Sequence, residues 1–276
     1  MTIQIFDTGY FYADGGAMFG AVPKTAWSRR YASDDQNGCV LAMRSALIKT
    51  DEGKIVLVDT GAGNKHLQAL SYYRFFQLSD LTEELRRRGV EPEEVTDVIL
   101  THLHFDHCGD CTRKDPASGR LLPTFPQAVH WVSRRQWENF RSPNPLEKAS
   151  YFPENMQAVE KAGLVRWLTG DVSLFPGLDL RLYDGHTPGQ IVPYIHTKEQ
   201  TFVFAGDVIP LAASLSPEWI SAYDTYPVTS YREKTRLLEE AVARRQALIF
   251  CHDAYTTVCT VKKIRDFFCK EQIISL

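Results

Sequence analysis

A dense group of polar side chains lies in Thr101-His102-Leu103-His104-Phe105-Asp106-His107-Cys108-Gly109, directly after the apolar run Val98-Ile99-Leu100. Residues two apart in extended backbone point to the same side, so His102, His104 and Asp106 are expected to converge. We expect His107 to reach the same point from the other side of a tight bend that ends at Gly109. Imidazole nitrogens and carboxylate oxygens are ligands of a borderline dication such as Zn²⁺, and four of them exceed the needs of one open catalytic site. The spacing therefore indicates two metal ions, and this ligand order after an apolar run argues against an ordinary solvated loop.

The order His102-x-His104-x-Asp106-His107 resembles the metal-binding motif of the metallo-β-lactamase superfamily. Four more segments resemble motifs of that family and follow its order along the chain: Val56-Leu57-Val58-Asp59-Thr60-Gly61, Gly185-His186-Thr187-Pro188-Gly189, Phe204-Ala205-Gly206-Asp207 and Phe250-Cys251-His252-Asp253. The resemblance implies an α/β fold, a metallo-β-lactamase-like αββα sandwich in which helices flank two mixed β-sheets.

The resemblance also implies roles for individual residues. One metal would be held by His102, His104 and His186, the other by Asp106, His107 and His252, and Asp207 would bridge both. Asp59 would act behind the ligands as an acceptor that orients a ligand histidine. The expected cofactor is two divalent metal ions per chain, zinc first, with Mn, Fe or Co as alternatives because nitrogen and oxygen ligands accept them too.

Two metal ions held this way can trap a hydroxide that attacks an ester or lactone carbonyl. Asp106 and Asp207 are the predicted catalytic residues, Asp106 because it can also move a proton after the attack. The motif with Phe105 is similar to that of the N-acyl-homoserine lactonases, so such a lactone is the first candidate substrate. Those enzymes carry a tyrosine three residues after the bridging aspartate, where this chain has Pro210.

Other functions remain open at this point. Within the family, a phosphotriesterase-like or a glyoxalase II-like hydrolase is the alternative. From a different class, Cys108 and Cys111 form a C-x-x-C pair that is compatible with a non-catalytic metal-binding or redox module. Cys251, by strand alternation, is expected to point away from the neighbouring ligand.

A substrate pocket is expected to have an apolar wall. Tyr12, Phe19, Trp27 and Phe105 would supply it if the N-terminal segment folds over the site, and Tyr223 is the candidate for orienting the leaving group. The arginine run at residues 86–88 ends a predicted helix away from the ligand motifs, so no clamp for an anionic phosphate is evident. This favours a neutral small-molecule substrate.

The composition limits the kinds of binding partner and the location that we expect. The net charge of −3 over 276 residues gives no basic footprint for nucleic acid, and no apolar run approaches the length of a membrane span. The first residues lack the features of a signal peptide, so we expect a cytoplasmic location. Six cysteines in a chain of this length do not indicate a disulfide framework, and a homo-oligomer is compatible with the sequence but not indicated by it.

The chain is expected to form one domain, residues 1–276, with an N-terminal extension at about 10–36 and an insertion at about 115–152 that flank the site. Alternating or apolar runs predict strands at 1–9, 40–48, 54–58, 96–100, 129–132, 178–182, 191–196, 201–205 and 248–250. Helical periodicity and caps predict helices at 79–88, 134–140, 231–245 and 264–268. In the third helix, Tyr231, Leu238 and Val242 are expected to form one apolar stripe, with Leu237 and Ala241 beside it.

Overall fold

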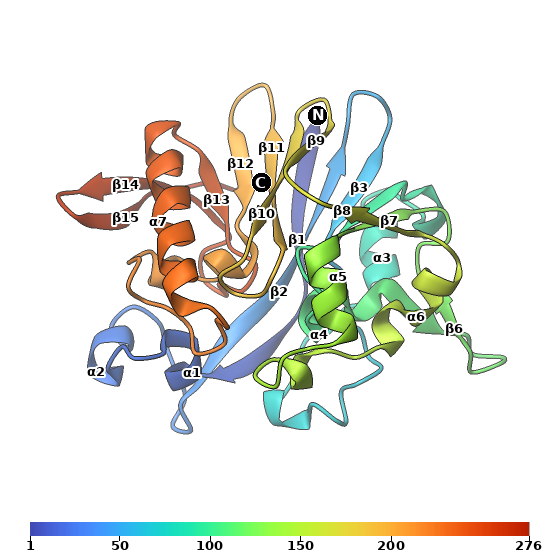
Figure 1. The fold of residues 1–276 in the computed structure, drawn as a ribbon, viewed down its shortest axis with the longest axis horizontal. Helices are drawn as coiled ribbons and strands as arrows, with labels where there is room; N and C mark the ends of the chain where they lie inside the picture. The colour runs from blue at the N-terminus through green and yellow to red at the C-terminus, as the bar shows by residue number, and fades with distance from the viewer. Residues whose placement is uncertain (276) are drawn as a thin grey trace. The chain divides into compact units, whose positions relative to one another are not determined.

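The protein, described over residues 1–275 by a computed structural model, folds as two compact units (Figure 1). The first unit consists of Met1–Tyr10 and Met43–Asp171, and the second of Phe11–Ala42 and Val172–Leu276. Each unit has its own hydrophobic core.

A six-stranded mixed sheet belongs mainly to the first unit. Its order is β1-β2-β3-β4-β7-β8, and its strands are β1 (Thr2–Asp14), β2 (Gly38–Lys49), β3 (Ile55–Val58), β4 (Asp97–Ile99), β7 (Val129–Ser133) and β8 (Val165–Leu168). The β2–β3 pair is antiparallel, whereas β3–β4, β4–β7 and β7–β8 are parallel. A separate hairpin is formed by β5 (Thr112–Lys114) and β6 (Leu121–Pro123). Parallel strands end at the same edge, so the segments that follow β3 and β4 meet there, and these segments carry Asp59 and the 101–109 motif.

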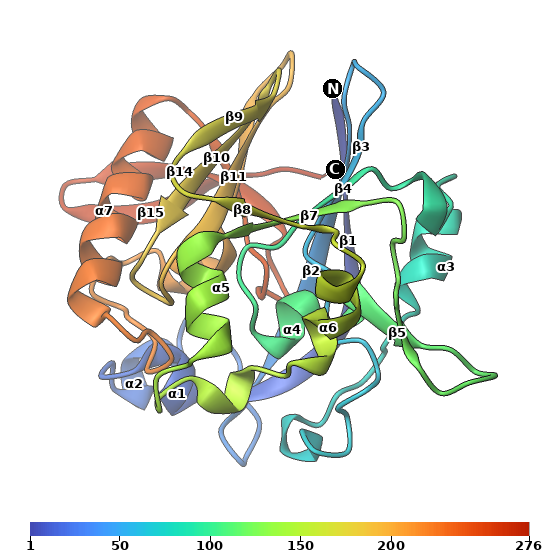
Figure 2. The same cartoon turned by 45° about the vertical axis from the view of Figure 1, so that its right-hand side comes forward.

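Four helices complete the first unit: α3 (Leu81–Arg86), α4 (Phe105–Cys108), α5 (Arg134–Arg141) and α6 (Glu154–Lys161). Figure 2 shows α5 beside β7 and β8, where Trp137 and Phe140 enter the same core as Val132 of β7. The helix α4 contacts α6, whose Met156 and Val159 are fully buried. The short metal-motif helix therefore rests on a packed apolar layer.

The second unit contains a seven-stranded mixed sheet of order β15-β14-β13-β12-β11-β10-β9. Its strands are β9 (Val172–Phe175), β10 (Leu178–Tyr183), β11 (Gln190–His196), β12 (Thr201–Phe204), β13 (Ala247–Ile249), β14 (Val258–Ile264) and β15 (Phe267–Ile273); its helices are α1 (Gly15–Phe19), α2 (Lys24–Trp27) and α7 (Pro227–Ala243). Only β12 and β13 pair in parallel. The helix α7, orange in Figure 1, packs Leu237, Leu238 and Ala241 into the core under this sheet.

Most of the predicted strands are confirmed. The hairpin of β2 and β3, the strand β4 before the motif and the hairpin of β11 and β12 form where alternation and turn residues predicted them. The helix predicted at 79–88 is α3, and Gly89 ends it with a positive φ of 68°. Its cap is Asp80 and not Ser79, because the Asp80 side chain accepts from the backbone N–H groups of Thr82 and Glu83.

The helix predicted at 264–268 is wrong. Residues 258–273 form the antiparallel hairpin of β14 and β15, in which Ile264 pairs with Phe267 across a two-residue turn. Arg265 in this turn has a φ of 53°, which a tight hairpin connection requires and a helix does not allow. The apolar residues there match both periods, and sheet pairing decided between them.

Two further expectations need correction. The segment predicted as an insertion at about 115–152 contains β7, which lies between β4 and β8 and is an interior strand of the sheet. The prolines of this segment lie outside β7 and α5, so they interrupt neither element. In α7, which begins at Pro227, Leu238, Leu237 and Ala241 are buried as expected, whereas Tyr231 is 43% exposed and the buried face continues through Ser230 and Lys234.

Among the described residues, no helix is both long enough and apolar enough to cross a membrane.

Gly109 closes the metal motif against the segment after β3, and we predict that this approach requires glycine. Its N–H donates to the Gly61 carbonyl at 2.7 Å, and a Cβ at Gly109 would lie 2.0 Å from the carbonyl oxygen of Ala62. Gly109→Ala should lower the free energy of unfolding by about 1–3 kcal/mol, the usual cost of overpacking. Urea unfolding with a chelator present measures this without a contribution from metal binding. Gly170→Ala, where a Cβ meets nothing within 4 Å, is the matched control, and equal losses in both variants would contradict the prediction.

Candidate metal centre

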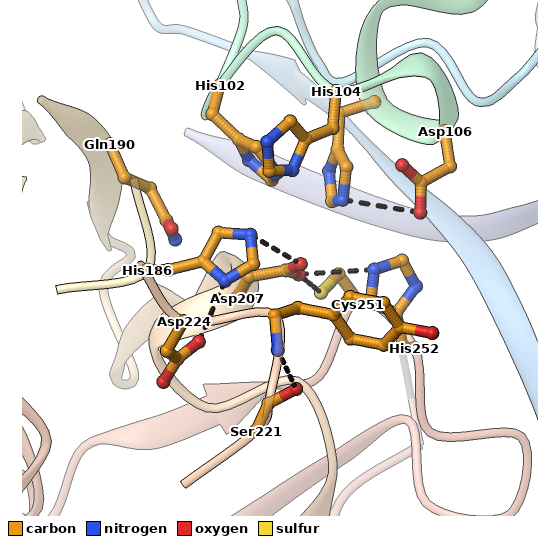
Figure 3. Close-up of polar contacts among 12 residues, drawn as sticks. His102, His104, Asp106, His186, Gln190, Asp207, Ser221, Asp224, Cys251 and His252 are labelled. Atoms are coloured by element: carbon orange, nitrogen blue, oxygen red, sulfur yellow. Dashed lines mark hydrogen bonds and ion pairs between the residues drawn. The ribbon is translucent and has the colours of Figure 1, made fainter. Parts of the chain in front are cut away.

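Three histidines of the first unit converge, although not by strand alternation alone. His104 has extended backbone (φ −66°, ψ 154°) and is the N-cap of α4, so Asp106 and His107 follow on a helical turn. The ring centroid of His102 lies 4.0 Å from that of His107 and 4.5 Å from that of His104. Figure 3 shows His102, His104 and Asp106 pointing to the same side of this segment. The expected convergence is present, but the period of 2 holds only as far as His104.

Asp59 holds one side of His107. Its carboxylate accepts from His107 Nδ1 at 2.7 Å and from the backbone N–H and the hydroxyl of Thr101, both at 2.8 Å. Asp59 is buried and has a φ of 56°, a left-handed conformation that non-glycine residues adopt rarely. Such a conformation persists when the surroundings over-determine it, and here three hydrogen bonds do so.

Glu147 holds one side of His104, although no sequence pattern predicted this role. The Glu147 carboxylate is buried and lies 3.1 Å from His104 Nε2. It also accepts from Tyr151 Oη and from Asn139 Nδ2, each at 2.8 Å. Because a carboxylate can only accept here, His104 Nε2 carries the proton and Nδ1 is the nitrogen left for a metal ion.

Asp207 lies between two histidines of the second unit. Its Oδ2 is 3.2 Å from His186 Nε2, and its Oδ1 is 3.1 Å from His252 Nε2 (Figure 3). Burial disfavours the charged form of His252, but the neighbouring Cys251 and Asp207 outweigh this and raise its pKa. Two imidazole nitrogens facing a carboxylate form a donor set that suits a divalent cation.

The loop that carries His186 is held by the segment before α7. Asp224 Oδ1 accepts from His186 Nδ1 at 2.8 Å, and the His186 carbonyl accepts from the N–H and hydroxyl of Thr225. Lys234 of α7 anchors this segment from below, because its buried ammonium donates to the Trp219 carbonyl at 2.8 Å. Burial lowers the pKa of Lys234 to about 8, against the opposing effect of Asp224 and Glu218.

His252 is fixed by backbone and by its neighbour in sequence. Its Nδ1 donates to the Ala42 carbonyl at 2.7 Å, and its N–H donates to the Pro210 carbonyl at 3.2 Å. Asp253 accepts from the N–H groups of Ala212, Tyr255 and Thr256, each at 2.8 Å. Pro210 therefore positions His252 through its carbonyl, while its ring offers no hydroxyl.

The prediction that Cys251 points away from the site is wrong. Its Sγ lies 3.1 Å from Asp207 Oδ1. The strand β13 ends at Ile249, so alternation no longer applies two residues later, where the backbone bends. Strand periodicity is a guide only while the ladder continues.

All five histidines of the two clusters share one structural feature. Each has one ring nitrogen held by a neighbour that is not a predicted metal ligand: His102 Nδ1 by the Thr101 hydroxyl at 3.1 Å, His104 Nε2 by Glu147, His107 Nδ1 by Asp59, His186 Nδ1 by Asp224 and His252 Nδ1 by the Ala42 carbonyl. Histidines that bind metals are held this way, because the outer partner sets the tautomer and the ring orientation. The residues present therefore fit divalent metal ions.

Two of the predicted pocket residues do not line an open pocket. Phe19 and Trp27 stack on each other with centroids 5.0 Å apart, and their side chains are 0% and 1% exposed. They pack inside the second unit because α1 and α2 turn both rings inward. Tyr12 is half-buried on β1, and Tyr223 is exposed directly before Asp224.

Phe105 lies in an aromatic cluster of the first unit. Its ring centroid is 5.2 Å from Tyr73, 6.2 Å from Phe75 and 6.5 Å from Phe152, and these three rings are half-buried. Because Phe105 stands between His104 and Asp106 in the chain, the cluster brings apolar surface close to the ligand residues. The sequence predicted Phe105 but not its partners, which come from two distant loops.

The two cysteines after the motif are not reactive groups. Cys108 and Cys111 are free and fully buried. Burial raises the pKa of Cys111 to about 12 and raises that of Cys108 as well. Thiols of this kind behave as small apolar side chains, which weakens the redox interpretation.

Comparison with known proteins agrees with this geometry. Residues 44–252 match the metallo-beta-lactamase superfamily. An N-acyl homoserine lactonase of Bacillus thuringiensis is 28% identical over 221 residues, which cover 74% of this chain and 78% of the relative. The structure of a probable metal-dependent hydrolase from Staphylococcus aureus superposes with a TM-score of 0.86 at 28% identity, covering 99% of this chain and 98% of the other. That of AidC, described as a dizinc quorum-quenching lactonase, superposes with a TM-score of 0.80 at 19% identity, covering 99% and 95%.

The chain belongs to the metallo-β-lactamase superfamily and has its fold, with two mixed sheets and helices, as the sequence motifs indicated. It is a hydrolase of this superfamily with lactonase homologues at modest identity.

The Glu147–His104 contact leads to a prediction about metal affinity. Glu147→Gln should weaken metal binding about 10- to 100-fold, the usual effect of removing an outer partner of a ligand histidine. Competition with a chromophoric chelator measures the affinity directly. Glu138→Gln is the matched control, because Glu138 is an exposed glutamate of α5 that faces Arg134 and not the motif. If both variants bound metal like the parent protein, Glu147 would have no positioning role.

Proposed function

We propose that this protein is a dinuclear metal-dependent hydrolase of neutral lactones or esters, with an N-acyl-homoserine lactone as the first candidate substrate. Membership of a hydrolase superfamily and lactonase relatives at 28% identity support this proposal. The observation that carries it is that every predicted ligand histidine has one ring nitrogen hydrogen-bonded to an outer partner. A purely structural polar cluster does not require each imidazole to be oriented.

The proposed ligand atoms follow from the nitrogens that are already in use. They are His102 Nε2, His104 Nδ1, His107 Nε2 and Asp106 from the first unit, and His186 Nε2, His252 Nε2 and Asp207 from the second. Zinc is the first candidate, and manganese, iron or cobalt fit the same donor types. When bound, two such ions lower the pKa of a water molecule towards about 7 and polarise a carbonyl oxygen.

The chain's own residues would contribute orientation, proton transfer and exclusion of water. Asp59, Glu147 and Asp224 hold the imidazoles in place, so little reorganisation is needed during reaction. Asp106 follows Phe105 on α4, and we assign it the transfer of a proton from the attacking hydroxyl group to the alkoxide that ring opening releases. The aromatic cluster around Phe105 offers apolar area for an acyl chain, in keeping with a neutral substrate.

The leaving alkoxide needs a partner, because Pro210 stands where the related lactonases carry a tyrosine. We propose Tyr223, the residue before Asp224 in the segment that orients His186. A phosphotriester remains the second candidate substrate, because the departure at Pro210 separates this chain from the lactonase pattern.

The first prediction from this proposal concerns metal content. The purified protein should hold two transition-metal ions per chain by elemental analysis. Asp207→Asn should lower the affinity for both, because an amide does not neutralise two dications. His196→Ala is the control, since His196 pairs with Asp179 on the surface of the sheet. Equal metal loss in the two variants would contradict the ligand assignment.

The second prediction concerns the substrate. Chelation should abolish hydrolysis of N-acyl-homoserine lactones, and the addition of zinc should restore it. Across a series of increasing acyl length, kcat/KM should rise, because a buried CH₂ contributes about 0.8 kcal/mol. Titration of the released acid measures the rate. Metal-loaded protein that cleaves a neutral phosphotriester but no lactone would favour the second candidate.

The third prediction concerns Tyr223. Tyr223→Phe should lower kcat roughly 10²-fold or more with little change in KM, as expected when a hydroxyl group stabilises the leaving alkoxide in the transition state. Tyr226→Phe is the matched control, because Tyr226 is an exposed tyrosine of the same segment. Unchanged kcat in Tyr223→Phe would assign the leaving group to another residue.

A further inference from the structure

A cavity lies in the second unit and is lined by side chains that no predicted catalytic step uses. Its volume is about 560 Å³, within the range of small-molecule sites. Four segments line it: residues 30–31 after α2, residues 212–216, residues 253–256, and the β14–β15 hairpin from 264 to 270. None of the predicted metal ligands is among the lining residues.

Two cations face this cavity with unused hydrogen-bond donors. Arg30 uses Nη1 to donate to the Ser216 hydroxyl at 3.0 Å, and its guanidinium stacks on Trp219 at 4.0 Å. Lys270 Nζ donates to the Thr256 hydroxyl at 3.2 Å. Within residues 1–275, neither cation pairs with a carboxylate, and Arg30 donates through Nη1, which leaves Nε and Nη2 available.

The acidic residue of the cavity does not cancel this charge. Both oxygens of Asp253 are occupied by backbone N–H groups, and the side chain is buried. Its negative charge is stabilised by backbone N–H dipoles, and the two cations outnumber it among the lining residues. The open side of the cavity keeps a net positive character.

Apolar side chains form the rest of the wall and are exposed. Phe267 is 64% exposed and Ile264 is 52% exposed, both at the tip of the β14–β15 hairpin, and Tyr255 is exposed opposite them. Figure 1 shows this hairpin extending beyond α7 at the edge of the second unit's sheet. Exposed apolar residues beside a cavity are typical of binding sites.

We propose that this cavity is a second, non-catalytic binding site for an amphipathic monoanion, a carboxylate that carries an unbranched apolar chain. The carboxylate would accept hydrogen bonds from Arg30 and Lys270, since planar guanidinium groups bind carboxylates in two-pronged fashion. The chain would lie along Phe267 and Ile264 and cover their exposed surface. Charge and polarity on the two sides of the cavity match this class of ligand and no neutral or cationic one.

Calorimetric titration with decanoate, below its micelle concentration, tests this site. We expect one binding event per chain in the metal-loaded protein, no binding of acetate, and no binding of decyltrimethylammonium, which has the same chain and the opposite charge. The double variant Arg30→Gln/Lys270→Gln should bind at least tenfold more weakly, and Phe267→Ser should weaken binding as well. Lys263→Gln, on the same hairpin but paired with Glu239 outside the cavity, should bind like the parent protein.

The metal centre is the competing site for a carboxylate, and it can be separated. Chelated protein and the Asp207→Asn variant should bind decanoate as the parent protein does, whatever their hydrolytic activity. Loss of binding on chelation would place the ligand on the metals and overturn the proposal. So would equal binding of the cationic amphiphile, or a dimer in sedimentation experiments that buries the hairpin and excludes decanoate.

Discussion

The site depends on one constraint, the fixed orientation of its imidazole rings. A histidine offers two nitrogens, and a metal centre needs a chosen one from each ring. In this chain the choice is made by oxygen atoms on the outer side, three of them buried carboxylates. Because Asp59 and Glu147 are fully enclosed, they are strong acceptors in surroundings of low dielectric constant. Removing one of them would leave a ring free to rotate, and removing Glu147 would also take away an acceptor of Tyr151 and Asn139.

The fold can be understood as the support for these outer residues. In the first unit, Asp59 follows β3 and the motif follows β4, and the parallel pairing of the two strands brings both to one edge. Glu147 lies in the loop after α5, where Asn139 of α5 donates to it. The helix α5 follows β7, which is an interior strand of the sheet. In the second unit, α7 holds the His186 loop by two contacts. Glu233 accepts from the N–H groups of Asp184 and Gly185, and Lys234 anchors the segment that carries Asp224. The ligands lie on short turns, and the long elements fix those turns.

This division explains what the sequence could and could not predict. The ligand residues are close together in the sequence or follow apolar runs, so motif and period were sufficient to identify the fold and to select the candidate ligands. Glu147 and Asp224 lie 43 and 38 residues from the histidines that they hold, and nothing local distinguishes them from surface acids. The predictions for Cys251 and for residues 264–268 were wrong for a different reason. Both were assigned by local periodicity at places where a bend or a hairpin partner decides the geometry.

The arrangement also links metal binding to stability. The oxygens of Asp207 face the imidazoles of His186 and His252 and the thiol of Cys251. A largely enclosed carboxylate is costly unless positive charge compensates it, and a protonated His186 or His252 would supply such charge. A divalent ion compensates the charge without requiring that protonation, so the ion binds the folded chain far better than the unfolded one and stabilises it by mass action. The contacts at Asp207 therefore also let a bound ion add stability to the second unit, whereas Asp59 and Glu147 in the first unit accept hydrogen bonds from protein donors. This difference follows from the chain's own hydrogen bonds, and it makes the Asp207 cluster the more metal-dependent of the two clusters.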